Sequence, residues 1–586
     1  MFRKVLVANR GEIAIRIFRT LREMGIASVA VYSEADRDAP FVSYADDAYL
    51  IGGHSPAQSY LQSESIIRTA ERAGAEAIHP GFGFLAENAD FARACAAAGL
   101  VFVGPPPEAI EAMGSKVSAR RAMEAAGVPV IPGTVDPVET VEDAVRAAAE
   151  IGYPVAVKAS AGGGGKGIEV AHNEDELRPG YEAARRQGKA YFADDTVFLE
   201  RYLDDPRHIE VQVMADSHGA VVHLGERDCS IQRRHQKIVE ETPSPAVSPE
   251  LRERIGRIGV EAARAVGYVN AGTVEGLLDR DGTYYFLEMN TRLQVEHTVT
   301  EMVTGIDLVR EQLRIAAGEP LGFSQDGVEL RGHSIQCRIN AEDPMRDFVP
   351  TPGRITRYRE PSGPGVRVDS GVVEGSAISE LYDPMIAKLV VWDADRDLAR
   401  RRMLRALSEF EIGGVKSLIP IHKAIMEHPE FAEGGSLREF VEGGGYARHV
   451  ASADGAVPAD GAIPDTAAQD EARTLVTEVD GRRFEVTVVM PEHPGRTRLR
   501  ARRSQLAERS ARHGGGQDVI RSPMQGTVLK VSVDEGDGVE AGQVLVVVEA
   551  MKMENEIVAH HAGTVDQVSV GAGDLVSSGQ ELLRLA

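Results

Sequence analysis

The first part of the chain alternates between short apolar runs and amphipathic segments. Residues 3–8, "RKVLVA", predict a short buried strand, and "ASVAVYS" at 27–33 predicts a second one. Between them, "GEIAIRIFRTLREMG" at 11–25 carries apolar residues at helical spacing and ends on a glycine, which predicts a helix. The alternation continues to Gly114, so residues 1–114 are expected to form a doubly wound α/β domain. No G-x-G-x-x-G motif follows the first strand, so the pattern does not support a dinucleotide site.

The pattern changes in the middle of the chain. Residues 115–320 read as an α+β domain with a glycine-rich insert, and residues 330–445 form a third block. Residues 446–473 are expected to be a linker, because 451–470 is rich in Ala, Asp, Gly and Pro. This stretch nearly lacks the large apolar residues that a core needs.

A short β segment and a basic stretch follow. The stretch "TLVTEVDGRRFEVTVVM" at 474–490 predicts a hairpin around Asp480 and Gly481. The basic residues of 496–512 fit a second linker or a small helix equally well. Residues 474–512 are therefore a candidate element for docking a partner, and a solvated linker remains the alternative.

The last block, residues 519–586, contains an internal repeat. "GTVLKVSVDEGDGVEAGQVL" begins at Gly526, and "GTVDQVSVGAGDLVSSGQEL" begins at Gly563, 37 residues later (563 − 526). Two sets of short strands with matching glycine turns predict a quasi-symmetric β sandwich or flattened barrel. Lys552, in "EAMKMEN", lies between the copies, so we expect it at the exposed tip of the hairpin that joins them.

Composition and charge exclude some functions. The 586 residues have a formal net charge of −24, which argues against a general nucleic-acid binder because phosphate binding needs clustered excess Lys and Arg. The three cysteines, Cys95, Cys229 and Cys337, lack metal-ligand spacing. No apolar run reaches the ~20 residues that span a bilayer. We expect a cytoplasmic, multidomain protein.

A glycine-rich loop is a candidate phosphate site. Residues 162–167 read "GGGGKG" and follow a strand-like run that contains Lys158. Backbone N–H groups of glycines can approach a phosphate where any Cβ would clash. A glycine run alone fits a plain flexible loop as well, but Lys158 and Lys116 can neutralise nucleotide phosphates and favour the phosphate site.

Polar residues recur at every second position of "FLEMNTRLQVEH", residues 286–297. In a strand these positions share one face. Carboxylates at one end suit Mg²⁺ with nucleotide phosphates, and a cation and an amide further on suit a small oxyanion. A carboxylate at the far end is a candidate base, and a half-exposed strand with a solvated face is the alternative. The polar positions are Glu288, Asn290, Arg292, Gln294 and Glu296, and a preceding strand adds Glu275.

Two further motifs are less specific. Positive charge concentrates in "RDCSIQRRHQKIVEE", residues 227–241, where the alternative is a surface turn balanced by Glu240 and Glu241. The loop "HPGFGFLAEN", residues 79–88, is only a weak indication of a functional site when it is taken alone. The cationic residues of the first motif are Arg227, Arg233, Arg234, His235 and Lys237.

Together, and in order, these motifs across residues 1–445 resemble the biotin carboxylase of the ATP-grasp superfamily. "SPMQGTVLKV" followed by "EAMKMEN" resembles the biotin carboxyl carrier domain, whose A-M-K-M lysine bears biotin through an amide bond. A lipoyl carrier has a similar fold, but its lysine typically lies between Asp and Ala. The whole chain resembles the α subunit of an acyl-CoA carboxylase. The resemblance implies a pre-ATP-grasp α/β domain (1–114), an ATP-grasp domain (115–320), a biotin carboxylase C-terminal domain (330–445) and an all-β biotinyl carrier domain (519–586).

The resemblance also implies roles for individual residues. ATP phosphates would contact Lys116, Lys158, Gly163, Gly164, Gly165, Lys166 and Gly167. Adenine would contact Glu200 and the backbone of Tyr202 and Leu203, and the nucleotide would pass His208, Gln232 and His235. Two Mg²⁺ or Mn²⁺ ions would be held by Glu275 and Glu288, with Asn290 near. Bicarbonate would contact Lys237, Arg292, Gln294 and the Val295 backbone, Glu296 would deprotonate it, Arg338 would steady the biotin enolate, and biotin would be attached to Lys552.

Two positions depart from the family pattern. Phe82 stands where the "HPGYGF" motif has a tyrosine, so a hydroxyl contact at the biotin pocket is lost. Thr298 replaces the proline of "VEHPVTE", from which we expect little effect.

The implied chemistry needs partners. A positioned carboxylate helps because bicarbonate is a poor nucleophile until it loses its proton, and the glycine-rich loop would close as a lid over a water-sensitive carboxyphosphate. Only ~75 residues lie between the third block and the carrier, and a domain needs ~100–200. We therefore expect a separate carboxyltransferase β subunit with the acyl-CoA site, a biotin protein ligase, and a homo-oligomer within a larger assembly.

Two alternatives stay open at this stage. The chain could belong to a different carboxylase, such as a two-subunit pyruvate carboxylase. It could also be a non-catalytic carrier or scaffold, against which the intact set of polar residues argues. The acyl chain length does not follow from the sequence, because the acceptor pocket is not in it.

Overall fold

The chain forms two compact units, Met1–Asp454 and Gly455–Ala586. None of the helices in the described part of the chain is long and apolar enough to cross a membrane. The computed structural model describes residues 1–134, 136–159, 168–192, 196–234, 236–453, 471–479, 482–490, 519–523, 526–550, 553–577 and 579–586.

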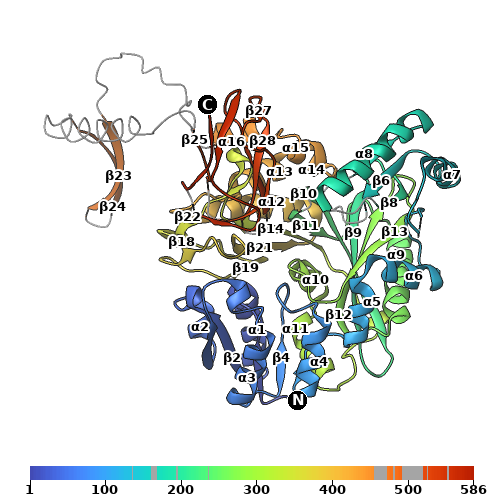
Figure 1. The fold of residues 1–586 in the computed structure, drawn as a ribbon. Coiled ribbons are helices and arrows are strands. Elements are labelled where there is room, and N and C mark those ends of the chain that lie inside the picture. Colours follow the sequence, from blue (N-terminus) through green and yellow to red (C-terminus); the bar gives the residue numbers. More distant parts are fainter. Residues whose placement is uncertain are drawn as a thin grey trace. The chain divides into compact units, whose positions relative to one another are not determined.

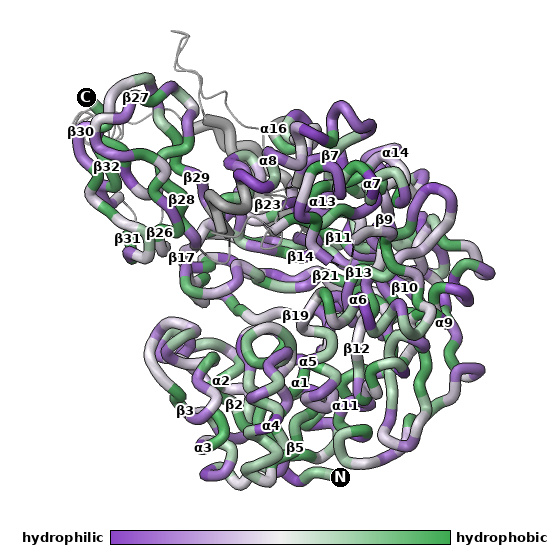
Figure 2. Tube along the Cα trace, turned by 45° about the vertical axis from the view of Figure 1, so that its right-hand side comes forward, coloured by the Kyte–Doolittle hydropathy of each residue, from purple (hydrophilic) through white to green (hydrophobic). Residues whose placement is uncertain are grey.

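The first unit begins with a parallel sheet in the order β3-β2-β1-β4-β5, as the doubly wound pattern predicts. Leu6 of β1 packs against α3, whereas Val5 and Val7 pack against α1 on the other face. Both faces are covered, which is why β1 is apolar without alternation. Figure 2 shows the mixed hydropathy of the covering helices, such as α1 and α3. The elements are β1 (Lys4–Val7), α1 (Gly11–Glu23), β2 (Ala27–Ser33), α2 (Pro40–Tyr44), β3 (Asp47–Gly52), α3 (Ser63–Ala73), β4 (Ala77–His79), α4 (Ala89–Ala97), β5 (Val101–Phe102) and α5 (Pro107–Gly114).

A small antiparallel sheet, β7-β6-β8, follows. Val155, Val157 and Leu199 are fully buried under α7 and α8. Strands β6 and β7 pair as far as Lys158 opposite Ile168, and the glycine-rich loop between them lies outside the described residues. The elements are α6 (Lys116–Ala125), α7 (Val141–Ile151), β6 (Val155–Ala159), β7 (Ile168–Ala171), α8 (Glu174–Phe192) and β8 (Val197–Arg201).

The largest sheet has eight antiparallel strands in the order β13-β12-β9-β10-β11-β14-β21-β19 (Figure 1). It crosses the expected domain boundary at 320–330, because β11 pairs with β14 from Val239 opposite Cys337 to Thr242 opposite Ser334. The second and third sequence blocks therefore share one sheet. Its strands and adjoining helices are β9 (Arg207–Ala215), β10 (Val221–Arg233), β11 (Gln236–Thr242), α9 (Pro249–Ala265), β12 (Asn270–Leu278), β13 (Tyr284–Asn290), α10 (His297–Thr304), α11 (Leu308–Ala316), β14 (His333–Asn340), β19 (Val366–Ser370) and β21 (Met385–Asp393).

Helices and short strands complete the first unit. The beginning of the expected linker is helical instead: Val450 of α16 is 1% exposed and packs in the same core as Tyr446, which directly precedes the helix. Residues 454–470, which make up most of that linker, lie outside the described residues. The remaining elements are β15 (Glu342–Asp343), β16 (Val349–Pro350), β17 (Gly353–Arg354), β18 (Arg357–Arg359), β20 (Ala377–Ile378), α12 (Arg396–Glu409), β22 (Glu411–Gly413), α13 (Ile419–Glu427), α14 (Pro429–Ala432), α15 (Arg438–Glu442) and α16 (Ala447–Ala453).

The second unit contains the predicted hairpin. Strands β23 (Glu471–Val479) and β24 (Arg482–Met490) pair antiparallel along their whole length. The first begins three residues before the expected start at 474, inside the expected linker. Asp480, Gly481 and the basic stretch at 496–512 lie outside the described residues.

The carrier block forms two four-stranded sheets, β25-β32-β30-β27 and β29-β28-β26-β31. Strands β26 and β30 begin 37 residues apart (563 − 526), as do β27 and β31 (575 − 538). The paired turn glycines share positive φ: Gly536 has +95° and Gly573 has +93°. The predicted quasi-symmetric sandwich is confirmed. Its strands are β25 (Val519–Arg521), β26 (Gly526–Val531), β27 (Gly538–Val539), β28 (Val544–Ala550), β29 (Met553–Val558), β30 (Gly563–Val568), β31 (Leu575–Val576) and β32 (Glu581–Leu585).

Candidate active site

A cavity of about 790 Å³ lies in the first unit between the small sheet and the large sheet. Its walls come from α6, from strands of both sheets, and from the irregular segment 291–296. Most of the candidate residues therefore meet in one place, although the first and the last of them lie 180 positions apart in the chain (338 − 158). Those that line the cavity are Lys158, Glu200, His208, Gln232, Lys237, Glu275, Glu288, Asn290, Arg292, Gln294, Val295, Glu296 and Arg338.

The polar series of 286–297 is not a single strand. Strand β13 ends at Asn290, and α10 begins at His297, so 291–296 leaves the sheet. The expectation of one strand face is wrong for the second half of the series. All five polar residues line the cavity nevertheless, because the irregular segment follows its wall.

Four charged residues form a row across adjacent strands of the large sheet. Arg227 on β10 is opposite Glu210 on β9, and Glu210 is opposite Glu275 on β12. Glu275 is in turn opposite Glu288 on β13. Like charges directly opposite each other destabilise a sheet unless cations lie between them. The row is therefore built to hold positive charge.

Lys237 supplies one such charge. Its Nζ lies 2.6 Å from Glu210 Oε2, 2.9 Å from Glu275 Oε1 and 2.7 Å from Glu296 Oε1. Burial lowers the pKa of Lys237, but these carboxylates outweigh it and hold the pKa well above its usual value. The ammonium therefore stays charged in the cavity wall.

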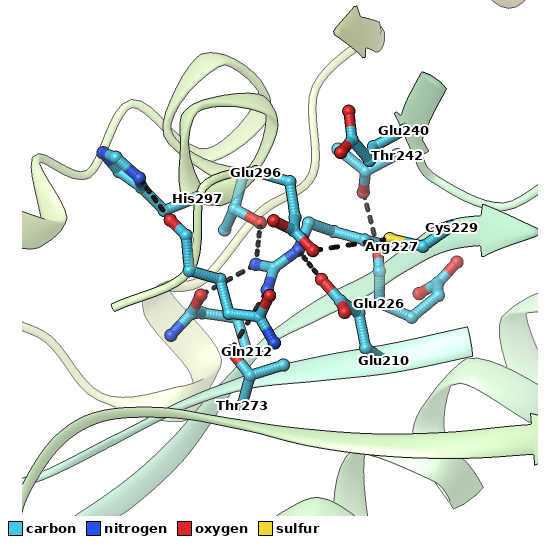
Figure 3. A network of polar contacts seen from close by, with 12 residues as sticks. Glu210, Gln212, Glu226, Arg227, Cys229, Glu240, Thr242, Thr273, Glu296 and His297 are labelled. Atoms are coloured by element: carbon cyan, nitrogen blue, oxygen red, sulfur yellow. Dashed lines mark hydrogen bonds and ion pairs between the residues drawn. The ribbon is translucent and has the colours of Figure 1, made fainter. Parts of the chain in front are cut away.

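Arg227 is fully buried and pairs with Glu210, one of the carboxylates that contact Lys237 (Figure 3). Its guanidinium pairs with Glu210 and donates to Gln212 Oε1 at 2.7 Å and to Thr300 Oγ1 at 3.0 Å. The sequence placed it in a general positive patch and missed Glu210. An acid inside the apolar run "HIEVQVM", residues 208–214, was the available signal.

The basic motif at 227–241 is therefore not a solvated turn. Arg227 and Lys237 face the carboxylates inside, whereas Arg233 and Arg234 form ion pairs with Asp347 near the surface. Glu240, expected as a surface counter-charge, is fully buried. His235 lies outside the described residues.

Glu296 faces two cations. Its Oε1 contacts Lys237, and Arg338 Nη2 donates to its Oε2 at 2.9 Å. Burial raises the pKa of the Glu296 carboxyl, but Lys237, Arg338 and Arg227 lower it more, so the pKa lies well below its usual value. Arg338 Nε also donates to Glu240 Oε1 at 2.5 Å. The carboxylate is therefore ionised and available to accept a proton.

Arg292 connects the cavity to the N-terminal domain. Its Nε donates to Glu87 Oε2 at 2.8 Å, and its Nη2 donates to Asn290 Oδ1 at 2.8 Å. Glu87 also accepts from the Thr291 backbone N–H at 3.0 Å. The weak motif "HPGFGFLAEN" thus orients the cation expected to bind bicarbonate, a role that the sequence did not indicate.

Several residues expected to contact the nucleotide come from the small sheet and from β9 of the large sheet. Lys158 Nζ forms an ion pair with Glu200 across β6 and β8, and His208 Nε2 lies 2.9 Å from Glu275 Oε2. Tyr202 donates its backbone N–H to Pro154 O at 2.8 Å, and neither it nor the buried Leu203 lines the cavity. Lys116 begins α6. The side chain of Lys116 and the residues Gly163, Gly164, Gly165, Lys166, Gly167 and Lys552 lie outside what the structure describes.

Four family models match the chain in order. The N-terminal domain of biotin carboxylase matches residues 1–110, and the ATP-binding domain of the carbamoyl-phosphate synthase L chain matches 115–323. The C-terminal domain of biotin carboxylase matches 336–443, and the model of biotin-requiring enzymes matches 518–585.

Known relatives agree with this order. The biotin-dependent acyl-coenzyme A carboxylase alpha3 subunit of Mycobacterium leprae is 44% identical over 584 residues, which cover 96% of this chain and 94% of that protein. One of the pyruvate carboxylase subunits of Methanothermobacter thermautotrophicus is 57% identical over 442 residues, which cover 75% of this chain and 90% of that protein. The chain belongs to the biotin-dependent carboxylases.

A solved structure of the same fold contains a nucleotide, magnesium and bicarbonate. The biotin carboxylase domain of Hydrogenobacter thermophilus 2-oxoglutarate carboxylase, crystallised with MgADP, ADP and bicarbonate, has a TM-score of 0.69 and 50% identity. The aligned residues cover 75% of this chain and 98% of the Hydrogenobacter domain. The chain described here is thus an ATP-dependent ligase that carboxylates biotin, and it uses ATP, Mg²⁺, bicarbonate and biotin.

The carboxylate row of this carboxylase fits a divalent cation. Glu275 and Glu288 are cross-strand neighbours whose repulsion a metal ion would relieve. Carboxylate oxygens and the Asn290 amide oxygen are the hard ligands that Mg²⁺ prefers. Glu275 Oε1 already accepts from Lys237, Asn290 and Gln294, so the site is organised around negative charge.

The two departures from the family pattern fall in packed positions. Phe82 is half-buried, with its ring centroid 6.0 Å from Lys388 Nζ, so the side chain faces a cation where the family has a tyrosine. Thr298 is fully buried in α10 and its hydroxyl donates to Gln336 Oε1.

A neutral carboxyl next to the cavity makes stability pH-dependent. Glu342 is 3% exposed, accepts from Asn340 Nδ2 at 3.1 Å, and has its pKa raised by burial to about 8. An unfolded glutamate ionises near pH ~4.3, so the folded state loses stability as pH rises from there toward 8, by at most about 5 kcal/mol at ~1.36 kcal/mol per pKa unit.

Glu342→Gln should therefore stabilise the carboxylase increasingly with pH. The amide stays neutral and can still accept from Asn340, so the penalty for ionising a buried carboxyl disappears. Thermal unfolding of variant and wild type should show a Tm difference that grows between about pH 5 and about pH 8. A difference of the same size at both pH values would mean that Glu342 is already ionised in the fold.

Proposed function

We propose that the chain is the α subunit of an acyl-CoA carboxylase, which carboxylates biotin on its own Lys552 for a separate carboxyltransferase β subunit. The observation that carries this proposal is the similarity to the acyl-CoA carboxylase subunit of Mycobacterium leprae over 96% of the chain. The more identical pyruvate carboxylase relative aligns with only 75% of the chain, the length of the carboxylase portion without the carrier. Biotin would be attached by a biotin protein ligase.

The cavity supports a division of roles along its length. Lys158, Lys116 and the loop 162–167 would bind the ATP phosphates, and Glu200, Tyr202, Leu203, His208, Gln232 and His235 would contact the rest of the nucleotide. Mg²⁺ held by Glu275 and Glu288, near Asn290, would neutralise phosphate charge. Positions in the wall of the cavity support the assignments of Lys158, Glu200, His208, Gln232, Glu275, Glu288 and Asn290. The other assignments rest on the resemblance of the sequence to biotin carboxylase.

The bicarbonate end would use the Lys237 cluster. Lys237, Arg292, Gln294 and the Val295 backbone would bind bicarbonate, and Glu296 would take its proton. Glu296 is a weak base while Lys237 and Arg338 both contact it. An anion that takes over part of those contacts would raise the pKa of Glu296 and make it a stronger base as substrate binds.

Arg338 would then face the reacting end of biotin. Its guanidinium is held between Glu240 and Glu296, and the buried His422 Nε2 lies 2.8 Å from its carbonyl oxygen. A cation fixed in this way can stabilise negative charge without moving. The loop 162–167 would exclude water from the site.

The molecule that accepts the carboxyl group from biotin tests the proposal. The purified full chain should cleave ATP in the presence of bicarbonate and biotin but should not carboxylate any acyl-CoA alone. Capture through biotin from native extract should bring down the β subunit, and the reconstituted complex should carboxylate acetyl-CoA, propionyl-CoA or a longer acyl-CoA. Carboxylation of pyruvate by that complex, with no acyl-CoA accepted, would contradict the proposal, as would acyl-CoA carboxylation by the chain alone.

A further inference from the structure

We propose that Lys388 is a positioning residue for the bicarbonate end of the cavity. Its buried ammonium would fix the backbone carbonyl of Val295 and, through it, the segment 291–296. The inference rests on the proposed function, which assigns bicarbonate contacts to that segment. Lys388 lies in β21, is fully buried, and does not line the cavity.

Lys388 combines one hydrogen bond with two ion pairs. Its Nζ donates to Val295 O at 3.2 Å and lies 3.0 Å from Glu12 Oε2 and 3.9 Å from Asp369 Oδ2. These acceptors come from an irregular segment, from the first turn of α1, and from β19. One side chain therefore ties the segment 291–296 to the N-terminal domain and to the far edge of the large sheet.

The segment needs such support because it lies between a strand and a helix. Residues 291–296 belong to neither β13 nor α10, yet Arg292, Gln294 and Glu296 must be held to a fraction of an ångström for catalysis. Two consecutive carbonyls are held from behind the cavity: Gln294 O lies 2.7 Å from His297 Nδ1, and Val295 O accepts from Lys388. Fixing these carbonyls fixes the direction of the side chains next to them.

Lys388 also stabilises the fold by pairing with a buried carboxylate, and the experiment must separate this effect from its effect on the segment 291–296. Glu12 is buried, and Lys388 is the cation paired with it, so Lys388→Met alone would leave an uncompensated buried carboxylate. Asp369 differs, because Arg367 Nη2 lies 2.7 Å from its Oδ2 and Arg19 Nη1 lies 3.5 Å from its Oδ1. The double variant Lys388→Met with Glu12→Gln therefore removes the Val295 contact and leaves no unpaired charge behind.

Three variants of the full chain test the inference in an assay of ATP cleavage with bicarbonate and free biotin. Glu12→Gln keeps the lysine and should leave both KM values within about twofold of wild type. The double variant should unfold at a Tm close to that of Glu12→Gln but raise the KM for bicarbonate about tenfold, the effect of losing a hydrogen bond from a charged donor. Its KM for ATP should stay within about twofold, because the nucleotide contacts do not involve this segment.

Arg292→Met is the positive control, since Arg292 lies on the segment itself and should raise the KM for bicarbonate. If the KM for bicarbonate were normal in the double variant but raised in Arg292→Met, the inferred role of Lys388 would be wrong. The proposed bicarbonate site would still stand. Equal increases in both KM values, or a double variant that does not fold, would reduce Lys388 to a structural ion pair. The assay contains no acyl-CoA, so an error in the proposed acceptor would not affect it.

Discussion

Replacing Lys552 by arginine should abolish carboxyl transfer to any acceptor while bicarbonate-dependent ATP cleavage with free biotin continues. Arginine keeps the positive charge, but its guanidinium is never deprotonated in proteins and cannot form the amide bond to biotin. The described strands support the position: β28 and β29 pair up to Ala550 opposite Met553, which leaves only residues 551 and 552 to connect them. A side chain at such a tip can enter another domain's cavity, and the tether raises its effective concentration there.

Intact-mass measurement after co-expression with a biotin ligase provides the readout. The wild type should carry one biotin and the Lys552→Arg variant none. Lys530→Arg, in β26 of the same domain, is the matched control and should carry one biotin. Biotin on the Lys552→Arg chain, or on another lysine of the wild type, would refute the assignment.

Glu296→Gln should slow bicarbonate-dependent turnover by about 10²–10⁴-fold, the usual contribution of a general base, while ATP affinity changes less than about twofold. The amide has the same shape but cannot take a proton. The fold should tolerate the change, because Lys237 keeps Glu210 and Glu275 as partners and Arg338 keeps Glu240. Steady-state kinetics with separate titrations of ATP and bicarbonate measure both effects.

Glu241→Gln is the control for the loss of a buried carboxylate. Glu241 lies in the same region but binds His333 and Arg396 instead of the cavity residues, so its removal should lower the Tm without this loss of turnover in the folded enzyme. If Glu296→Gln weakened ATP binding in proportion to turnover, Glu296 would belong to the metal site.

The sequence predicted the parts of the fold that follow from local periodicity. The buried run at 27–33 became β2 with the same bounds, and the spacing of 37 residues between the carrier repeats recurs in the strands. The chemistry at 286–297 was predicted from the alternation of residue types. The end of β13 at Asn290 was not, because the alternation continues through the irregular segment.

Buried charges could not be placed from the sequence. Arg227 and Glu210 satisfy each other across two strands whose pairing depends on tertiary structure, so each looked like an ordinary polar residue on its own. Glu87 contacts Arg292, about 205 residues away (292 − 87), and Lys388 contacts Val295, about 93 residues away (388 − 295). A local sequence pattern cannot indicate contacts over such separations. What sequence reasoning lacked was the register of the large sheet.

That sheet also limits how the chain can be divided. A fragment ended between 320 and 330 would keep β11 but lose its neighbour β14, exposing a row of unpaired backbone N–H and C=O groups along an edge strand that carries Ile238 and Val239. Open apolar edges pair with other copies and aggregate. Recombination or engineering that separates the nucleotide-binding part from the C-terminal part would therefore produce an insoluble product, whereas exchange of whole units at 454–470 cuts no described strand pairing.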